Sequence, residues 1–285
     1  MKFKSFPPYA TIFDRIWYYG FRAICGLIFI FLIVPILVII PLSFNSVPFF
    51  TFTPEMLSFD PAGYSLRWYN DFFTNENWRG AVNNSFIIAI FSTLIATMLG
   101  TLAALGLSRR NIPYRTLMMA LLISPMIVPL IISACGMFFF YSRIHLQGTH
   151  IGVILAHAAL GTPFVVITVT ATLVGFDRSL IRAASNLGAD GVTTFFKIIV
   201  PLILPGVISG ALFAFITSFD EVVVILFVGS FEQRTIPWQM FSGIRENISP
   251  TILAVATLLV LVSIGLLSTI EILRRRGERL RGVSV

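Results

Sequence analysis

Long runs of apolar residues, separated by shorter polar segments, extend along almost the whole chain. Six of them approach or exceed the roughly 20 residues that a helix needs to cross the apolar core of a bilayer. They occupy residues 24–42, 86–107, 117–141, 151–174, 202–228 and 251–273. The pattern predicts an all-α integral membrane protein with six transmembrane helices in a single domain, residues 1–285. A short interfacial helix is predicted at residues 65–73.

The composition excludes the soluble classes of protein. Of the 285 residues, 56% are hydrophobic and 12% are charged, and this charged share is about half that of a soluble domain. Such a chain has too little polar surface to cover a soluble fold. We therefore exclude a soluble enzyme, a disordered chain and a disulfide scaffold.

The first apolar run is predicted to be an uncleaved membrane anchor. It is longer than the apolar core of a signal peptide, it contains Pro35 and Pro41, and no small-x-small cleavage site follows it.

The distribution of basic residues predicts the orientation. Fifteen of the 20 Lys and Arg residues lie in the two tails and in the loops after the second and fourth runs. Basic loops face the cytoplasm, so both termini are predicted to be cytoplasmic. The formal charge of +7 then needs no nucleic-acid partner.

Motifs for covalent chemistry are missing from the sequence. It contains no G-x-x-x-x-G-K-[ST], H-E-x-x-H, C-x-x-C or G-x-S-x-G. The histidines lack metal-ligand spacing: His145 and His150 are predicted to be solvated loop residues, whereas His157 is predicted to form a hydrogen bond between helices. Cys25 and Cys135 lie in apolar runs. We expect a protein that performs no covalent chemistry and has neither a metal site nor an ATP site of its own.

The polar segment 175–200 reads as a short amphipathic helix with its own start and stop signals. Asp177 is the predicted N-cap. Leu180, Ala184 and Leu187 share one face at i, i+4 and i+7. Gly188 is placed to end the helix in the left-handed conformation. From the residues alone, this helix either lies on the lipid surface or docks into a groove on a cytoplasmic partner.

The same segment resembles the EAA loop in permease subunits of bacterial ABC importers. Two positions depart from the family pattern: Arg182 stands in place of the leading Glu, and Val200 stands in place of Leu. The positions that match are Ala183, Ala184, Gly188, Ile198 and Pro201.

This resemblance implies the type I ABC importer permease fold in the bacterial inner membrane. It implies that the loop is a coupling helix seated in a separate ATPase subunit, which would hold the ATP and Mg²⁺. The expected partners are two copies of that ATPase, a second permease chain, a soluble extracytoplasmic binding protein and the lipid bilayer.

Two acids, Asp220 and Glu221, fall inside the fifth apolar run, where each charge costs at least about 2.5 kcal/mol. One interpretation is a structural pair held by donors from neighbouring helices. The other is an anionic lining or gate for a cationic substrate, with Ser218 and Phe219 beside it. Adjacent residues on a helix point about 100° apart, so we expect one acid to face the pathway and the other a partner helix.

The segment from Ser218 to Val224 resembles the second permease of spermidine/putrescine-type importers. This resemblance implies a polyamine or a related small nitrogenous solute. Related permeases carry amino-acid derivatives, opines or ferric iron. Two rivals stay open: a secondary transporter driven by an ion gradient, which often shows inverted repeats, and a channel-like or scaffold protein. No internal repeat is evident.

Prolines are predicted to interrupt two spans, Pro125 and Pro129 in the third and Pro163 in the fourth. They act either as packing kinks or as hinges on the transport path. Small residues on the fifth span favour close contact with another helix: Gly206, Gly210, Ala211 and Ala214.

Overall fold

The computed structural model describes all residues except 1–10, 109–111, 175–176, 178, 247–248 and 281–285. The regular structure of this described part is helical, apart from an isolated β-bridge between Asn45 and Tyr64. The chain divides into two compact units, one of residues 75–242 and one of residues 1–74 with 243–285. The all-α prediction is confirmed.

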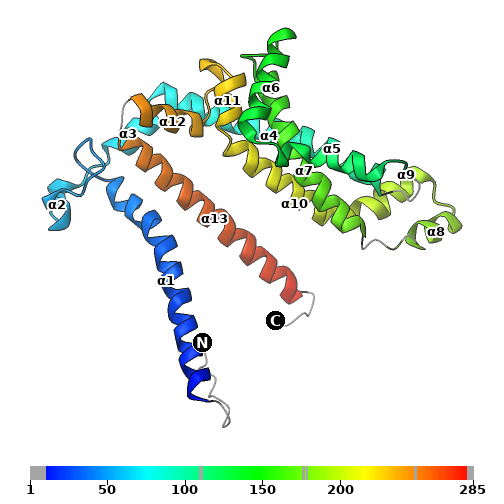
Figure 1. The fold of residues 1–285 in the computed structure, drawn as a ribbon, viewed down its shortest axis with the longest axis horizontal. Helices are drawn as coiled ribbons and strands as arrows, with labels where there is room; N and C mark the ends of the chain where they lie inside the picture. The colour runs from blue at the N-terminus through cyan, green and yellow to red at the C-terminus, as the bar shows by residue number, and fades with distance from the viewer. Residues whose placement is uncertain (1–10, 109–111, 175–176, 178, 247–248, 281–285) are drawn as a thin grey trace. The chain divides into compact units, whose positions relative to one another are not determined.

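Three long helices form the centre of the unit of residues 75–242: α4 (Glu76–Leu107), α7 (His150–Val174) and α10 (Val200–Phe219) (Figure 1). Small residues let them approach closely. A Cβ atom on Gly100 would lie 2.6 Å from the Cβ of Val165, and one on Gly210 would lie 2.8 Å from the Cα of Val165. The predicted small-residue contact on the fifth span is therefore made, at least in part, within this chain.

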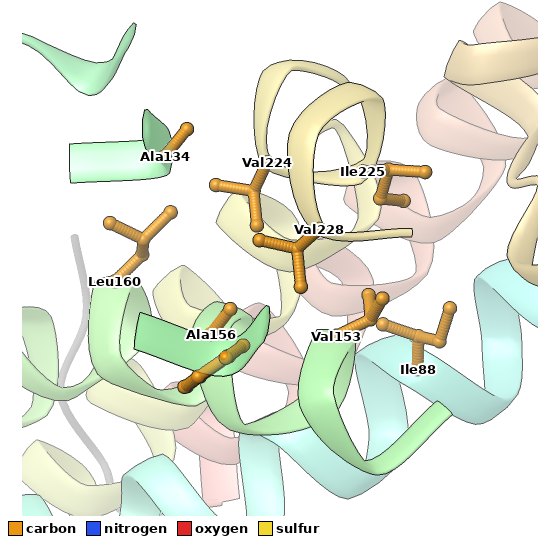
Figure 2. Packing of buried hydrophobic residues seen from close by; sticks show 9 residues of the cluster. Ile88, Ala134, Val153, Ala156, Leu160, Val224, Ile225 and Val228 are labelled. Carbon is orange, nitrogen blue, oxygen red and sulfur yellow. The ribbon is translucent and has the colours of Figure 1, made fainter. Parts of the chain in front are cut away.

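A cluster of buried apolar side chains joins this centre to two short helices, α6 (Leu130–Arg143) and α11 (Val223–Val228). Figure 2 shows Val224 and Val228 of α11 above Ala156 of α7. Burial of these side chains fixes α11 on α7, although α11 has only six residues and would be unstable alone.

The third apolar run is interrupted, as its prolines predict. It forms α5 (Arg115–Ile127) and α6, which meet at an angle of 101°. Val128, the residue before Pro129, has the extended conformation that a following proline favours, with φ −68° and ψ 134°. Pro129 therefore ends the helical path, whereas Pro125 is accommodated inside α5.

The fourth run behaves in the opposite way. Helix α7 continues without a break through Pro163, which is buried. Pro163 therefore does not break the helix, while a kink or a hinge at this residue stays a prediction.

The fifth run is also broken, and the prediction of one continuous span over 202–228 is wrong. Helix α10 ends at Phe219, and α11 begins at Val223. The residues between them include both acids. Their polar side chains favour a helix end over an apolar helix interior, because they can bond the free backbone groups there.

Shorter elements complete this unit. After α7 come α8 (Ser179–Asn186), α9 (Gly191–Thr194) and a π-helical segment, η2 (Phe195–Ile199), which leads directly into α10. After α11 come the 3₁₀ turn η3 (Phe231–Gln233) and α12 (Ile236–Glu246), whose last residues belong to the other unit.

The other unit contains α1 (Ile12–Leu42), α2 (Pro54–Leu57), the 3₁₀ turn η1 (Pro61–Gly63), α3 (Arg67–Thr74) and α13 (Thr251–Leu280). Helix α3 confirms the helix predicted at 65–73. Its Asp71 accepts a hydrogen bond of 2.7 Å from the Thr251 hydroxyl at the start of α13. Asn45 is fully buried, and its backbone carbonyl oxygen accepts a 2.7 Å hydrogen bond from Trp68 Nε1.

Four described helices are long and apolar enough to span a membrane, and the bent α5–α6 pair makes a fifth candidate. In α13, the apolar stretch within the described side chains is Thr251–Gly265. The multi-pass membrane fold is supported, while six spans and cytoplasmic termini stay predictions.

Candidate functional site

The loop of residues 175–200 is built from short helices whose ends are capped. Asp177 accepts two hydrogen bonds from Ser179, one from its backbone N–H at 2.8 Å and one from its hydroxyl at 2.6 Å. These bonds, with the charge of Arg182, lower the pKa of Asp177 below its ordinary value. Asp177 therefore caps the start of α8 as predicted, while residues 175, 176 and 178 lie outside the described part.

Gly188 ends α8 in the predicted left-handed conformation, with φ +83°. Its N–H donates to the Ser185 carbonyl oxygen at 3.0 Å, and the Ala189 N–H donates to the Ala184 carbonyl oxygen at 3.0 Å. This pair of bonds is the Schellman arrangement. Asp190 then caps α9 by accepting a 2.9 Å hydrogen bond from the Thr193 N–H, so a new helix starts soon after the turn.

The apolar face predicted for α8 is divided by the fold. Ala184 is 5% exposed and packs within the chain, whereas Leu187 is 88% exposed. Leu180 is also exposed. Arg182 and Ala183 face solvent as well. The loop therefore presents leucine side chains that nothing in the described chain covers.

A π-helical turn connects this loop to α10. The Val200 N–H donates to the Phe195 carbonyl oxygen, five residues earlier. Ile198 is half-buried in this turn. Pro201 is the second residue of α10, directly after this π-helical turn. The helical path is then continuous from Gly191 to Phe219, so α9 and η2 are joined to α10 without a break.

The break between α10 and α11 separates the two acids by environment. Glu221 is 8% exposed, and its Oε1 accepts a 3.0 Å hydrogen bond from the Val224 N–H in the first turn of α11. Asp220 is exposed. The expectation that the acids point apart on one helix is wrong in its premise, because neither lies in a helix. Their side chains nevertheless have different surroundings.

The residues before the break are fixed by packing. Ser218 is buried, and its Oγ lies 2.9 Å from Nδ1 of the fully buried His157, which confirms the predicted bond between helices. The ring of Phe219 packs edge-on against Phe86, with centroids 5.4 Å apart, and stacks on Phe215.

Sequence reasoning missed one polar cluster near this break. His150 was expected to be solvated, but its ring contacts Asn84 at 3.1 Å and Gln233 at 3.5 Å. These partners are 66 and 83 residues away in sequence, so no local pattern could reveal them. His145 is exposed, as expected. The described residues contain no group of three or more His, Cys, Asp or Glu side chains that could hold a metal ion.

A family model for binding-protein-dependent transport system inner membrane components matches residues 96–277. The chain belongs to this family. It is a multi-pass inner-membrane permease subunit of an ABC importer, and not an enzyme.

Curated relatives and a solved structure agree with this assignment. This permease is 30% identical to the spermidine/putrescine transport system permease protein PotC of Haemophilus influenzae, over 90% of this chain and 97% of PotC. It is 33% identical to the putrescine transport system permease protein PotI of Escherichia coli, over 89% and 90% of the two chains. A chain from the crystal structure of a bacterial ABC transporter that imports alginate has the same fold, with a TM-score of 0.69, 16% identity and coverage of 94% and 99%.

Proposed function

We propose that this permease imports a polyamine, spermidine or putrescine, or a closely related small nitrogenous solute. The observation that carries the proposal is the similarity to PotC and PotI over about nine tenths of the chain. An exposed carboxylate, Asp220, at the break after α10 suits a cationic solute. The alternative is an importer for an amino-acid derivative, an opine or ferric iron.

The loop of residues 175–200 is proposed to couple the permease to ATP hydrolysis on a separate subunit. Leu180 of α8 and Leu187, just after it, are presented to a partner. The Schellman turn at Gly188 leads from α8 to α9, and α9 and η2 continue into α10 without a break. A displacement of α8 by the ATPase would therefore reach the break at Asp220 with little loss. In the assembled importer we expect two ATPase copies that hold ATP and Mg²⁺, a second permease chain, and a binding protein that delivers the solute.

Within this scheme the two acids take separate roles. Asp220 lines the pathway or its gate, with Ser218 and Phe219 holding the end of α10 beside it. Glu221 is a structural residue, because its carboxylate is already occupied by the first turn of α11. Pro129 is the strongest hinge candidate of the three prolines, since a 101° bend lies next to it.

Uptake of radiolabelled spermidine and putrescine tests the substrate directly. The permease, expressed with its partner subunits in a strain without polyamine uptake, is expected to restore ATP-dependent accumulation of at least one of the two. Restored growth on another nitrogenous solute with no polyamine uptake would overturn the substrate assignment. Uptake that persists without any ATPase subunit would favour an ion-coupled transporter instead.

Affinity purification in mild detergent tests the coupling loop. Leu187→Ser is expected to reduce the co-purified ATPase several-fold. The matched control is Leu57→Ser in α2, since Leu57 is a comparably exposed leucine, at 68%, in the other unit. Equal recovery of ATPase with both variants would contradict docking through α8.

A further inference from the structure

Three polar side chains fasten the loop after α11 to helices α4 and α7. Asn84 of α4 donates from Nδ2 to the carbonyl oxygens of Glu232 at 2.7 Å and Arg234 at 3.0 Å. Its Oδ1 lies 3.1 Å from Nε2 of His150, the first residue of α7. Nδ1 of His150 lies 3.5 Å from Nε2 of Gln233, which is 1% exposed.

The other hydrogen bonds of these amides determine the protonation state of His150. Because Nδ2 of Asn84 already donates to two carbonyls, its Oδ1 faces His150 as an acceptor, and Nε2 of His150 must carry a proton. Gln233 Oε1 accepts from the Ser230 N–H at 3.0 Å and from the Ser230 hydroxyl at 2.6 Å. The Gln233 NH₂ group therefore faces Nδ1 of His150, which must be an unprotonated acceptor. The cluster fits neutral histidine in one tautomer.

A second proton on His150 would disrupt this cluster. Nδ1–H would then oppose the Gln233 NH₂ group, donor against donor. A flip of the Gln233 amide would restore that contact, but it would break both bonds to Ser230. The contact is thus present when His150 is neutral and is lost when the ring gains a second proton.

The loop held by this cluster adjoins the break that carries the acids. Helix α11 is capped at its start by Glu221, and at its end the Val228 carbonyl oxygen accepts a 2.8 Å hydrogen bond from the Gly148 N–H. Gln233 follows α11 by only five residues. Whatever frees this loop therefore loosens one end of the segment that positions Asp220.

We propose that His150 is an acid-sensitive latch, a positioning residue that holds the side chain of Gln233, and with it the turn of residues 230–233, only while its imidazole is neutral. The basic-residue distribution predicts that this loop lies on the outer side of the membrane, where the pH varies with the environment. Protonation of His150 would break either its own contact with Gln233 or, after a flip of the amide, the two bonds from Ser230 to Gln233, while Asn84 keeps its bonds to the carbonyl oxygens of Glu232 and Arg234. Arg234 would remain bound through its Nη2 to Asn77 Oδ1 at 3.0 Å, so the expected change is local mobility and not unfolding.

Other charged groups on the surrounding elements leave the assignment to His150 unchanged. They are Glu76 and Arg79 on α4, Arg143 and His145 before α7, and Glu232 and Arg234 in the loop itself. In the part of the chain that the structure describes, the ring of His150 bonds to Asn84 and Gln233, and no bond joins it to any of these six side chains. His145 is the other titratable imidazole in this group, and it supplies the control.

A spin label on the loop measures the latch directly. The label is attached at Glu232→Cys in a chain with Cys25→Ala and Cys135→Ala, assembled with its partner subunits in lipid nanodiscs. We expect the mobile fraction of the spectrum to rise about twofold or more between roughly pH 7.5 and 5.5. This readout is loop mobility and not uptake, so it fails or succeeds independently of the polyamine assignment.

Two variants and one control decide the origin of the response. His150→Gln keeps a donor and an acceptor without a titratable proton, and it should give an immobile label at both pH values. Gln233→Leu should give a mobile label at both. His145→Asn, chosen because asparagine tolerates the positive φ of 58° at this position, should respond like the parent. The proposal would be overturned if the parent spectrum did not change with pH. It would also be overturned if the pH response persisted in His150→Gln or Gln233→Leu.

Discussion

The imidazole of His157 on α7 and the hydroxyl of Ser218 on α10 form a buried hydrogen bond, with Nδ1 and Oγ 2.9 Å apart. Nε2 of the same ring has no hydrogen-bond partner among the described residues. A single bond therefore offsets the burial of this imidazole, and it joins two of the three central helices just before the break at Asp220.

Removing one partner of this pair is expected to cost more than removing both. Ser218→Ala leaves both ring nitrogens of His157 buried without a partner, and we expect the free energy of unfolding to fall by about 1–3 kcal/mol. In the His157→Leu background the same serine change should cost much less. Thermal unfolding of the purified complex, followed by size-exclusion chromatography, measures both. An equal loss in the two backgrounds would contradict the coupling.

The close approach of α4 to α7 makes a second prediction. Gly100→Ala would place a Cβ atom 2.6 Å from the Cβ of Val165, so the helices must move apart, at a cost of about 1–3 kcal/mol. Gly106→Ala on the same helix meets nothing within 4 Å and should be neutral or slightly stabilising. The thermal midpoints of the two variants separate these outcomes, and equal midpoints would show that the packing at Gly100 can relax.

The apolar runs predicted most helices correctly and the prolines predicted the break at Pro129, but nothing in the sequence revealed the break between α10 and α11. Where every position is apolar, the sequence has no periodicity that would change at a helix end. Pro129 breaks the third run, yet Pro163 lies inside an unbroken helix, because a proline is tolerated wherever the surrounding packing satisfies the freed backbone groups. The difference depends on neighbours that are remote in sequence.

The loop of residues 175–200 was more predictable than the acid-bearing break. Asp177 and Gly188 act on backbone groups within a few residues, so their capping roles can be read locally. By contrast, the bond from Glu221 to Val224 could be predicted only if the end of α10 were already known. The partners of His150 required the complete arrangement of α4, α7 and the loop after α11.

Gly188 supports a third prediction, on the shape of the loop of residues 175–200 and its proposed role in coupling. Its φ is +83°, and an alanine held in this left-handed conformation would be about 1–2 kcal/mol less stable than glycine, although the space around the residue is open. Gly191→Ala is the matched control, because that glycine also has open space and lacks a positive φ. We expect Gly188→Ala to lower the ATPase activity of the assembled complex more than Gly191→Ala does. The reverse order would show that the left-handed turn does not matter for coupling.

The cap at Asp177 makes a fourth prediction, on pH. Hydrogen bonds from Ser179 lower the pKa of this carboxyl from its ordinary 3.8, so its contribution is present above that value and is lost only as the pH falls through the lowered pKa. Co-purification of the ATPase should therefore not change through this group between about pH 5 and 9. Asp177→Asn, which keeps an acceptor, should retain the ATPase better than Asp177→Ala.

Substitutions of the two acids at the break are expected to have different effects on complex yield and on uptake. Asp220→Asn removes an exposed charge that no described contact uses, so the complex should assemble at normal yield while polyamine uptake falls by about tenfold or more. Glu221→Gln keeps an oxygen that can accept from the Val224 N–H, and its yield should stay close to normal. Glu221→Ala leaves that N–H without its partner, and its yield should drop, in line with the loss of about 1 kcal/mol typical of a helix cap.

Complex yield and uptake per complex, measured for all three variants, separate a pathway role from a structural one. If Asp220→Asn lowers the yield as Glu221→Ala does and leaves uptake per complex unchanged, then Asp220 is structural and the pathway lies elsewhere in the membrane domain.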